Sequence, residues 1–239
     1  MNLRKNNWTN EDYQEFIAYL KSQEDSKYKN FHKSLIKENI NLIGIRTPIL
    51  KKISSEIYHG NYESFLNQIK FKYYEETIIY GFIICKIKNV KELFHYLKIY
   101  IKHIDCWPEC DLFVSNLKIV NKNKELFIKY IDKNITSANP WQIRLCYVLL
   151  LSYYIDKDYI NKIFTYSNNN NNNDYYVKMA IAWTISLCYI KYKDITLNYL
   201  KNENTLDTWT YNKTIQKIIE STRISQEEKE YLKTLKSKH

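Results

Sequence analysis

The sequence predicts an all-α protein in which pairs of helices stack into a right-handed α-solenoid. The 239 residues include only three Gly and three Pro, too few for the many tight turns of an all-β fold. A pattern also recurs along the chain. The tetrapeptide Lys-Glu-Leu-Phe occurs at 91–94 and, 33 positions later, at 124–127, and Trp107 is followed 34 positions later by Trp141. A period of this length accommodates two antiparallel helices, so we expect one continuous domain over residues 1–239.

The expected helices form an N-terminal group over residues 9–70 and repeated helix pairs over about 74–236. The N-terminal helices are expected to begin at Thr9 or Asn10, at Ser26 (reaching Lys37), at Thr47 with Pro48 as the first helical residue, and at Tyr62. Gly60 provides a C-cap for the third of these helices. The pairs are expected at about 74–103, 107–134, 140–166, 174–202 and 206–236, and they open near Tyr74, Trp107, Trp141, Tyr175 and Trp209. Between two of them, the run Asn168–Asn173 is interpreted as a solvated low-complexity loop without a function.

The charge balance favours a polyanionic partner. Lys and Arg number 36 against 26 Asp and Glu, a net charge of +10. An excess of this size suits nucleic acid or an acidic membrane surface, although a generally Lys-rich composition explains it equally well. The longest apolar stretch, Leu145–Ile155, is too short to span a bilayer. Charge alone therefore leaves nucleic acid and an acidic membrane surface open as partners.

The five Cys residues lack CxxC spacing, and most fall on apolar helix faces. This pattern indicates reduced, buried thiols. The segment Met1–Asn10 is polar and does not resemble a signal peptide. We expect a monomeric cytoplasmic protein that associates with the nucleoid when it binds DNA.

Three helices carry residues that stand out from this scaffold. Pro108 starts a helix on which Trp107 and Asp111 share one face, because they lie four residues apart. Arg144 follows Trp141 in an apolar helix, and Trp183 lies in the middle of another. Charges in apolar surroundings are costly unless they are paired or face a polar groove. An ordinary core role for each Trp, and a purely structural ion pair between Asp111 and Arg144, remain the alternatives.

Basic residues on the first helix of each pair are available to follow a duplex backbone in a salt-dependent manner. They are Lys118, Arg144, Lys178, Lys213 and Lys217. Lys213 and Lys217 lie at i and i+4 and so share one helix face. The alternative is an ordinary solvated helix surface.

At these positions the sequence resembles the AlkD-type DNA alkylation-repair glycosylases, a family of HEAT-like repeats. The likeness extends from Leu42–Pro48 to the helix at Trp209, and it is carried by Trp107-x-x-x-Asp111, Trp141-x-x-Arg144 and Ala180–Trp183. The resemblance implies that Trp107, Asp111 and Trp183 line the cleft for the damaged nucleotide, with Asp111 as the catalytic carboxylate. It implies that Arg144 contacts the DNA there. The implied substrate is double-stranded DNA with N3- or N7-alkylated purines.

The chemistry of such a reaction fits these residue types. Alkylation makes the purine cationic and a good leaving group, so a carboxylate that stabilises positive charge on the sugar and orients a water is sufficient. Indole rings contact a cationic nucleoside favourably. No metal or organic cofactor is expected. Two departures from the family pattern are Leu35, where a Tyr is expected, and a single Trp at 107 where two adjacent ones are expected.

Three other functions are compatible with parts of the sequence. A non-catalytic HEAT-like protein that binds distorted or branched DNA would keep the basic surface without needing Asp111. A protein-interaction scaffold would not need the net charge of +10. A metal site at His103, Cys106 and Cys110 would lack a fourth ligand. The presence of Asp111 favours the glycosylase.

Overall fold

A computed structural model describes residues 1–36 and 40–236 of the chain. The protein is all-helical, with 71% of its residues in helices. No strand occurs among the described residues. The all-α prediction is therefore confirmed, and consecutive helices pack on one another as in an α-helical repeat protein.

The chain forms two compact units, which are described separately. Unit 1 comprises Met1–Lys122 and unit 2 comprises Asn123–His239. The α-helices of unit 1 are α1 (Asn10–Ser22), α2 (Ser26–Leu35), α3 (Thr47–Tyr58), α4 (Tyr62–Gln68), α5 (Tyr74–Ile84), α6 (Val90–Tyr100) and α7 (Trp107–Asn116). Its 3-10 helices are η1 (Ile101–His103) and η2 (Lys118–Lys122). The helices of unit 2 are α8 (Lys124–Asn134), α9 (Pro140–Tyr153), α10 (Ile160–Asn168), α11 (Tyr175–Lys191), α12 (Lys193–Asn198), the π-helix η3 (Tyr199–Glu203), α13 (Thr208–Ile219) and α14 (Gln226–Thr234).

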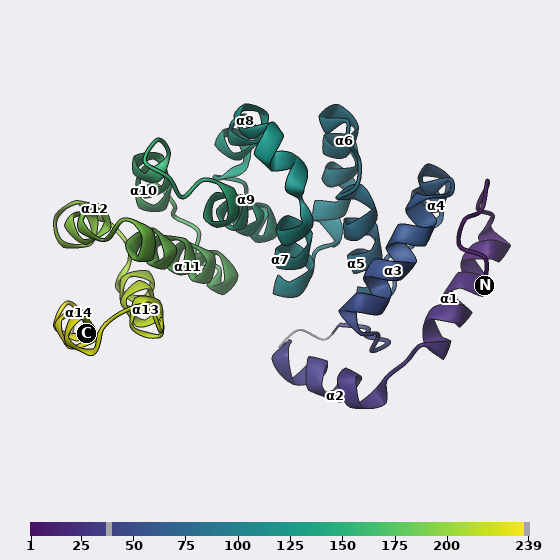
Figure 1. Cartoon of the computed structure of the whole chain (residues 1–239), viewed down its shortest axis with the longest axis horizontal. Helices are drawn as coiled ribbons and strands as arrows, with labels where there is room; N and C mark the ends of the chain where they lie inside the picture. The colour runs from purple at the N-terminus through teal and green to yellow at the C-terminus, as the bar shows by residue number, and fades with distance from the viewer. Residues whose placement is uncertain (37–39, 237–239) are drawn as a thin grey trace. The chain divides into compact units, whose positions relative to one another are not determined.

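In unit 1, α3, α5 and α7 pack side by side, and α4 and α6 lie against α3 and α5 (Figure 1). The helix α5 is mostly apolar, apart from Glu75 and Glu76 in its first turn, and every one of its residues is buried, which makes it the centre of this unit. A cluster of edge-to-face rings, Trp8, Phe16 and Phe65, joins the N-terminal segment to α1 and α4. This cluster fixes the N-terminal segment to the first helices of unit 1.

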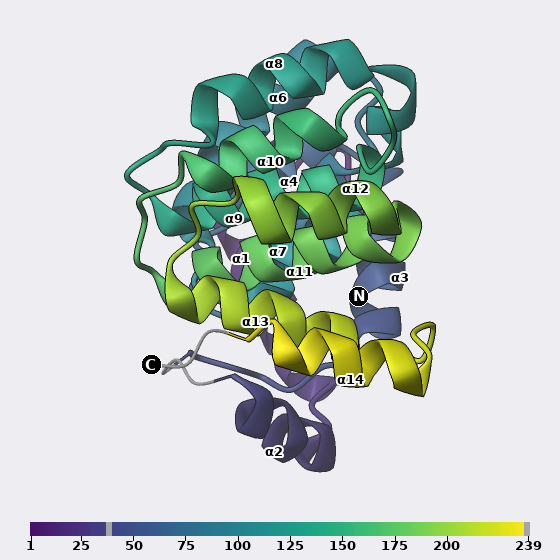
Figure 2. The same ribbon diagram turned by 90° about the vertical axis from the view of Figure 1, so that its left-hand side faces the viewer.

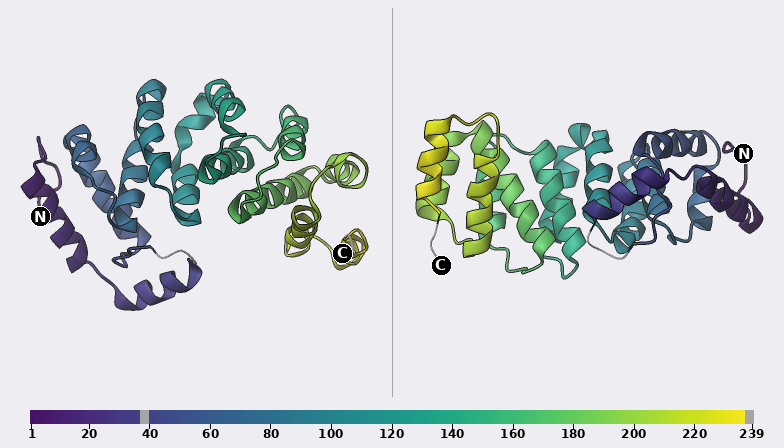
Figure 3. Two further views of the ribbon diagram at one scale, coloured as in Figure 1. Left: turned by 180° about the vertical axis from the view of Figure 1, so that it is seen from behind. Right: turned by 90° about the horizontal axis from the view of Figure 1, so that it is seen from below.

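In unit 2, α9, α11 and α13 form one layer, with α11 in contact with both neighbours (Figure 2). The helices α12 and α14 pack against α11 and α13, and Figure 3 shows α14, in yellow, beside α13. Both α9 and α11 carry apolar residues around their whole circumference, since each is covered on several sides. This layer brings three helix N-termini into successive positions, as the predicted repeats require.

The observed helices begin within a few residues of the predicted positions, and two predicted details of α3 were wrong. Arg46, not Thr47, occupies the N-cap of α3, so that Pro48 is the second helical residue. The C-cap is His59 rather than Gly60. The space at Gly60 is limited instead by the N-terminal segment, because an added Cβ would lie 2.8 Å from the backbone oxygen of Lys5. The predicted extension of the second helix to Lys37 falls outside the described residues.

Four of the five thiols are buried, as predicted from their positions: Cys106, Cys110, Cys146 and Cys188. Within the described part of the chain, no helix combines the length and the apolar character that a membrane span requires.

Candidate nucleic-acid interface

The start of α7 in unit 1 carries the first two predicted site residues. Cys106 is the N-cap, Trp107 is the first helical residue and Pro108 the second. The side chain of Glu109 turns back and accepts hydrogen bonds from the N–H groups of Asp105 (2.7 Å) and Cys106 (3.2 Å). This capping box closes the helix start and fixes the direction in which Trp107 leaves it.

Glu109 and Asp111 lie two residues apart on α7, in different surroundings. Glu109 is only 2% exposed, and its burial raises the pKa of its carboxyl to about 8 despite the backbone hydrogen bonds. Asp111 is half-buried and lies one helical turn after Trp107, on the same face. Of the two carboxylates, Asp111 is therefore the one that a ligand can reach.

The C-terminal end of α2 lies beside the start of α7. The Trp107 indole Nε1 lies 3.5 Å from the backbone oxygen of Leu35, the last residue of α2, to which it donates a long hydrogen bond. The Leu35 side chain is 48% exposed. His32 anchors the helix, because its buried ring packs edge-on against Tyr74 at the start of α5, with ring centroids 4.8 Å apart. Position 35, where a Tyr is expected from the family pattern, thus lies directly beside Trp107.

The remaining predicted catalytic residues belong to unit 2. Arg144 on α9 is 6% exposed, and its Nη1 donates a 2.9 Å hydrogen bond to the backbone oxygen of Tyr176 on α11. Its guanidinium carbon lies 5.8 Å from the centroid of the Tyr176 ring. Trp183 is half-buried on α11, seven residues or about two turns after Tyr176. Arg144 and Trp183 are therefore carried by two helices that pack together.

An aromatic surface extends from this point along the starts of α9, α11 and α13. Ring centroids are separated by 4.9 Å between Trp141 and Tyr176, 5.2 Å between Tyr176 and Tyr175, and 5.6 Å between Tyr175 and Trp209. We call these four residues the aromatic ladder. Sequence reasoning noted aromatic residues at the opening of each helix pair but used them only as marks of the repeat. That periodicity was the signal that could have identified the ladder.

Two of the predicted DNA-binding lysines flank the ladder. The Nζ atoms of Lys178 and Lys213 lie 5.3 Å and 5.6 Å from the centroid of the Trp209 ring. Lys178 also forms a 2.8 Å ion pair with Asp207. Burial alone would raise the pKa of Asp207, but hydrogen bonds from Lys178 and Thr210 outweigh it and hold the pKa below its usual value.

The other lysines lie farther from the rings. Lys217 forms a 3.8 Å pair with Glu220 one turn along α13, whereas Lys213 donates to the neutral Gln216 at 2.8 Å. Lys118 is exposed in unit 1, but it belongs to the 3-10 helix η2 rather than to the α-helix on which it was expected.

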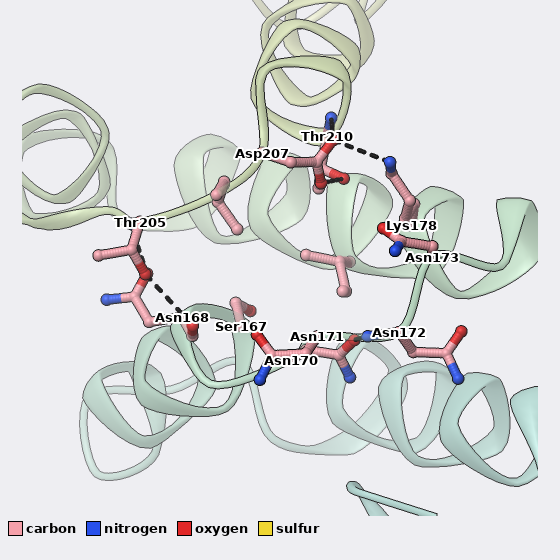
Figure 4. Close-up of a pocket in the computed structure, with 12 residues that line it drawn as sticks. Ser167, Asn168, Asn170, Asn171, Asn172, Asn173, Lys178, Thr205, Asp207 and Thr210 are labelled. Atoms are coloured by element: carbon pink, nitrogen blue, oxygen red, sulfur yellow. Dashed lines mark hydrogen bonds and ion pairs between the residues drawn. The ribbon is translucent and has the colours of Figure 1, made fainter. Parts of the chain in front are cut away.

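A polar cavity of about 380 Å³ borders the ladder at Lys178 (Figure 4). It is lined by asparagines of the 168–173 run, by Lys178 and Ile181 of α11, and by Thr205–Asp207 and Thr210. The loop prediction is wrong at Asn168. It ends α10, donates to the Glu203 backbone oxygen at 3.1 Å and accepts from the Tyr199 hydroxyl at 2.8 Å. The run therefore also fixes α10 to the segment after α12.

The proposed metal site has no support in the geometry. The ring of His103 stacks on Phe71 with centroids 3.8 Å apart, while Cys106 and Cys110 are buried in unit 1. Among the described residues, no group of three or more His, Cys, Asp or Glu is arranged to hold a metal ion.

The sequence model of the family described as "DNA alkylation repair enzyme" matches residues 14–218, which is well over half of the chain. No curated protein matches the chain.

Proposed function

Since the chain belongs to the DNA alkylation repair enzyme family, we propose that it hydrolyses the N-glycosidic bond of N3- and N7-alkylated purines in duplex DNA. The observation that carries this proposal is the start of α7, where Trp107 and Asp111 share one accessible face. The neighbouring Glu109 is occupied by two backbone N–H groups and is buried, so it is unsuited to contact substrate. Asp111 is half-buried rather than buried, and we assign the reaction to its carboxylate.

In the proposed reaction, the bond between C1′ and the base nitrogen breaks and its electron pair goes to the base. The alkylated purine loses its positive charge as it leaves, and positive charge develops on the sugar. The Asp111 carboxylate stabilises that charge and accepts a proton from the water that attacks C1′. The products are the free base and an abasic sugar.

The other predicted residues supply binding. Trp107 and Trp183 offer indole surfaces to the cationic nucleoside and the adjoining sugars. Arg144 has only a small accessible area, so we expect it to contact the DNA backbone through that part while it holds Tyr176 in place. Lys178, Lys213 and Lys217 neutralise phosphates along the duplex.

Release of 7-methylguanine and 3-methyladenine from alkylated duplex DNA tests the proposal. The Asp111→Asn variant should lose excision by about 100-fold or more, because it removes the charge that stabilises the sugar cation. The matched control is Asp105→Asn, which makes the same chemical change at an exposed position just before α7 and should keep parental activity. Excision at the parental rate by Asp111→Asn would make Asp111 a structural residue.

A second candidate function is binding of distorted or branched DNA without excision. It is favoured by Leu35, an apolar residue beside Trp107 where the family pattern expects a Tyr. No release of either base, together with intact binding to duplex or junction DNA, would support this second function.

A further inference from the structure

The aromatic ladder differs from the aromatic clusters that build the core. In unit 2, Phe164 and Tyr199 stack with centroids 4.0 Å apart, and both rings are buried. The four ladder residues are all partly accessible, and Tyr175 is 45% exposed. Contiguous aromatic surface that stays accessible to solvent indicates a binding site, since burying it would stabilise the fold more.

The ladder follows the repeats rather than a single helix. Its rings come from the first turns of α9, α11 and α13, which lie next to each other in one layer (Figure 2). Asn139, Asp174 and Asp207 cap these helices and fix the adjacent aromatic residues, since each accepts a hydrogen bond from the backbone N–H of the second or third helical residue. The ladder is therefore a continuous surface, fixed at three helix starts, that a chain-like ligand can follow.

Cations accompany the rings along this line. Arg144 lies against Tyr176, and both Lys178 and Lys213 lie within 6 Å of the Trp209 centroid. A lysine ammonium is a mobile point charge on a flexible stem, so it can leave a ring face to meet a phosphate. Lys213 can do so directly, whereas Lys178 exchanges its ion pair with Asp207 for the phosphate. Alternating rings and cations are the combination by which proteins bind single strands, because bases stack on the rings and phosphates meet the charges.

An intact duplex cannot use the rings in this way, since its bases already stack on each other. We propose that the aromatic ladder, with Lys178 and Lys213, binds an unpaired DNA strand. The DNA repair family of the chain favours DNA over RNA as the ligand. The adjoining cavity, with its asparagine amides, offers hydrogen-bonding partners to the Watson–Crick edges of bases, which are exposed only when a strand is unpaired. The proposal does not involve Asp111 and holds whether or not the protein excises bases.

Fluorescence anisotropy with a labelled twelve-nucleotide oligo-dT, compared with a blunt duplex of the same length, tests the ladder. Trp209→Ala should weaken single-strand binding about tenfold, and Tyr175→Ala about fivefold, since each removes one stacking surface. Duplex binding should change less than twofold, because every cation is kept. Tyr231→Ala is the matched control: it removes a 41% exposed Tyr on α14, away from the ladder, and should leave both affinities unchanged.

Several outcomes would overturn the proposal. The first is that Trp209→Ala and Tyr175→Ala leave single-strand affinity unchanged. The second is that these variants lose equal affinity for the single strand and the duplex. The third is that the protein binds an oligo-U tenfold more tightly than oligo-dT. Trp209→Phe keeps a ring and a folded helix start, so recovery of most of the affinity by this variant supports stacking. Asp111→Asn should bind the single strand like the parent protein, which separates this test from that of base excision.

Discussion

The two units use the same structural position, the N-terminal end of a helix, for different purposes. In unit 1, the starts of α5 and α7 are closed by buried carboxylates. Glu76 closes α5 and Glu109 closes α7, since each accepts a hydrogen bond from the N–H group of its helix's own N-cap residue. The adjacent Glu75 accepts hydrogen bonds from the N–H groups of residues 43–45 at 2.7–3.2 Å and so holds that loop against α5. These side chains bind backbone N–H groups and hold chain segments together.

In unit 2, the starts of α9, α11 and α13 are capped by partly exposed side chains, as at Asp174, and the adjacent aromatic residues face outward. The cations there lie on rings or on exposed partners such as Asp207. A polar residue at a helix start therefore does not by itself indicate a ligand site. Accessibility separates Asp111 and the ladder, which a ligand can reach, from Glu75 and Glu109, which it cannot.

The largest expected effect is the pH dependence of stability due to Glu109. Its pKa of about 8 in the folded chain lies above the ordinary value of 4.5. The folded state therefore binds the proton more tightly than the unfolded state, and stability is lost as pH rises from about 4.5 to about 8. A shift of this size corresponds to roughly 4–5 kcal/mol. Urea unfolding at several pH values should show the decrease.

Glu109→Gln provides the control, because Gln keeps an acceptor oxygen but cannot ionise. The variant should show a flatter profile across this pH window. Asp207 in unit 2 should affect stability in the opposite direction. Its pKa is lowered in the folded chain, so the stability that its carboxylate contributes is lost as pH falls through the folded pKa. Identical profiles for the parent and Glu109→Gln would show that Glu109 is not the titrating group.

A smaller but still large effect is expected from Glu75→Ala. This change leaves three buried N–H groups without an acceptor and should lower the free energy of unfolding by about 3–4 kcal/mol. Asp174→Ala removes the partly exposed N-cap of α11 in unit 2 and should lower the free energy of unfolding by only about 1 kcal/mol. Denaturant titration followed by circular dichroism measures both. Equal losses at the two sites would remove the distinction between the units, and Glu75→Gln is the milder variant if Glu75→Ala does not fold.

Leu35→Tyr tests whether the start of α7 is a catalytic surface. Position 35 adjoins Trp107 and its side chain is 48% exposed, so a Tyr fits without repacking the core. We expect excision of methylated purines to rise about threefold to tenfold, the effect of roughly 1 kcal/mol of added contact energy. Phe31→Tyr, one turn earlier on α2 and 60% exposed, is the matched control and should change nothing. A similar gain in both variants would show that the effect is not specific to position 35.

Much of the fold could be predicted because its signals are local. Thr9 caps α1 with its side chain, and Asn139 followed by Pro140 starts α9, as the residue types indicate. The buried glutamates could not be predicted in the same way, since Glu is rarely buried and the partners of Glu75 come from residues 43–45, about 30 positions away. Burial there depends on how distant segments pack.

In the candidate site, too, features within one helix could be predicted and contacts between helices could not. Spacing within one helix correctly placed Trp107 and Asp111 on one face of α7. Contacts between helices were not predictable: the pairing of Lys178 with Asp207 and the contact of Tyr175 with Trp209 join residues about 30 positions apart. Such contacts depend on the packing angle of α11 and α13, which a hydrophobic pattern does not specify.

The smallest expected effect separates two lysines on one helix. Lys213 has a neutral hydrogen-bond partner, Gln216, whereas Lys217 must leave Glu220 before it can meet a phosphate. In a titration of duplex binding against salt, Lys213→Gln should therefore reduce the slope of log K against log salt by about 0.9, and Lys217→Gln by less than half of that. The affinity at moderate salt should fall only about twofold to threefold for Lys213→Gln, as expected for one phosphate contact among several. Charge reversal at both positions, Lys213→Glu with Lys217→Glu, should weaken duplex binding further and flatten the slope most. If Lys217→Gln instead had the larger effect, the duplex would approach α13 along its later turns, and the ladder would not lie on the path of the phosphate backbone.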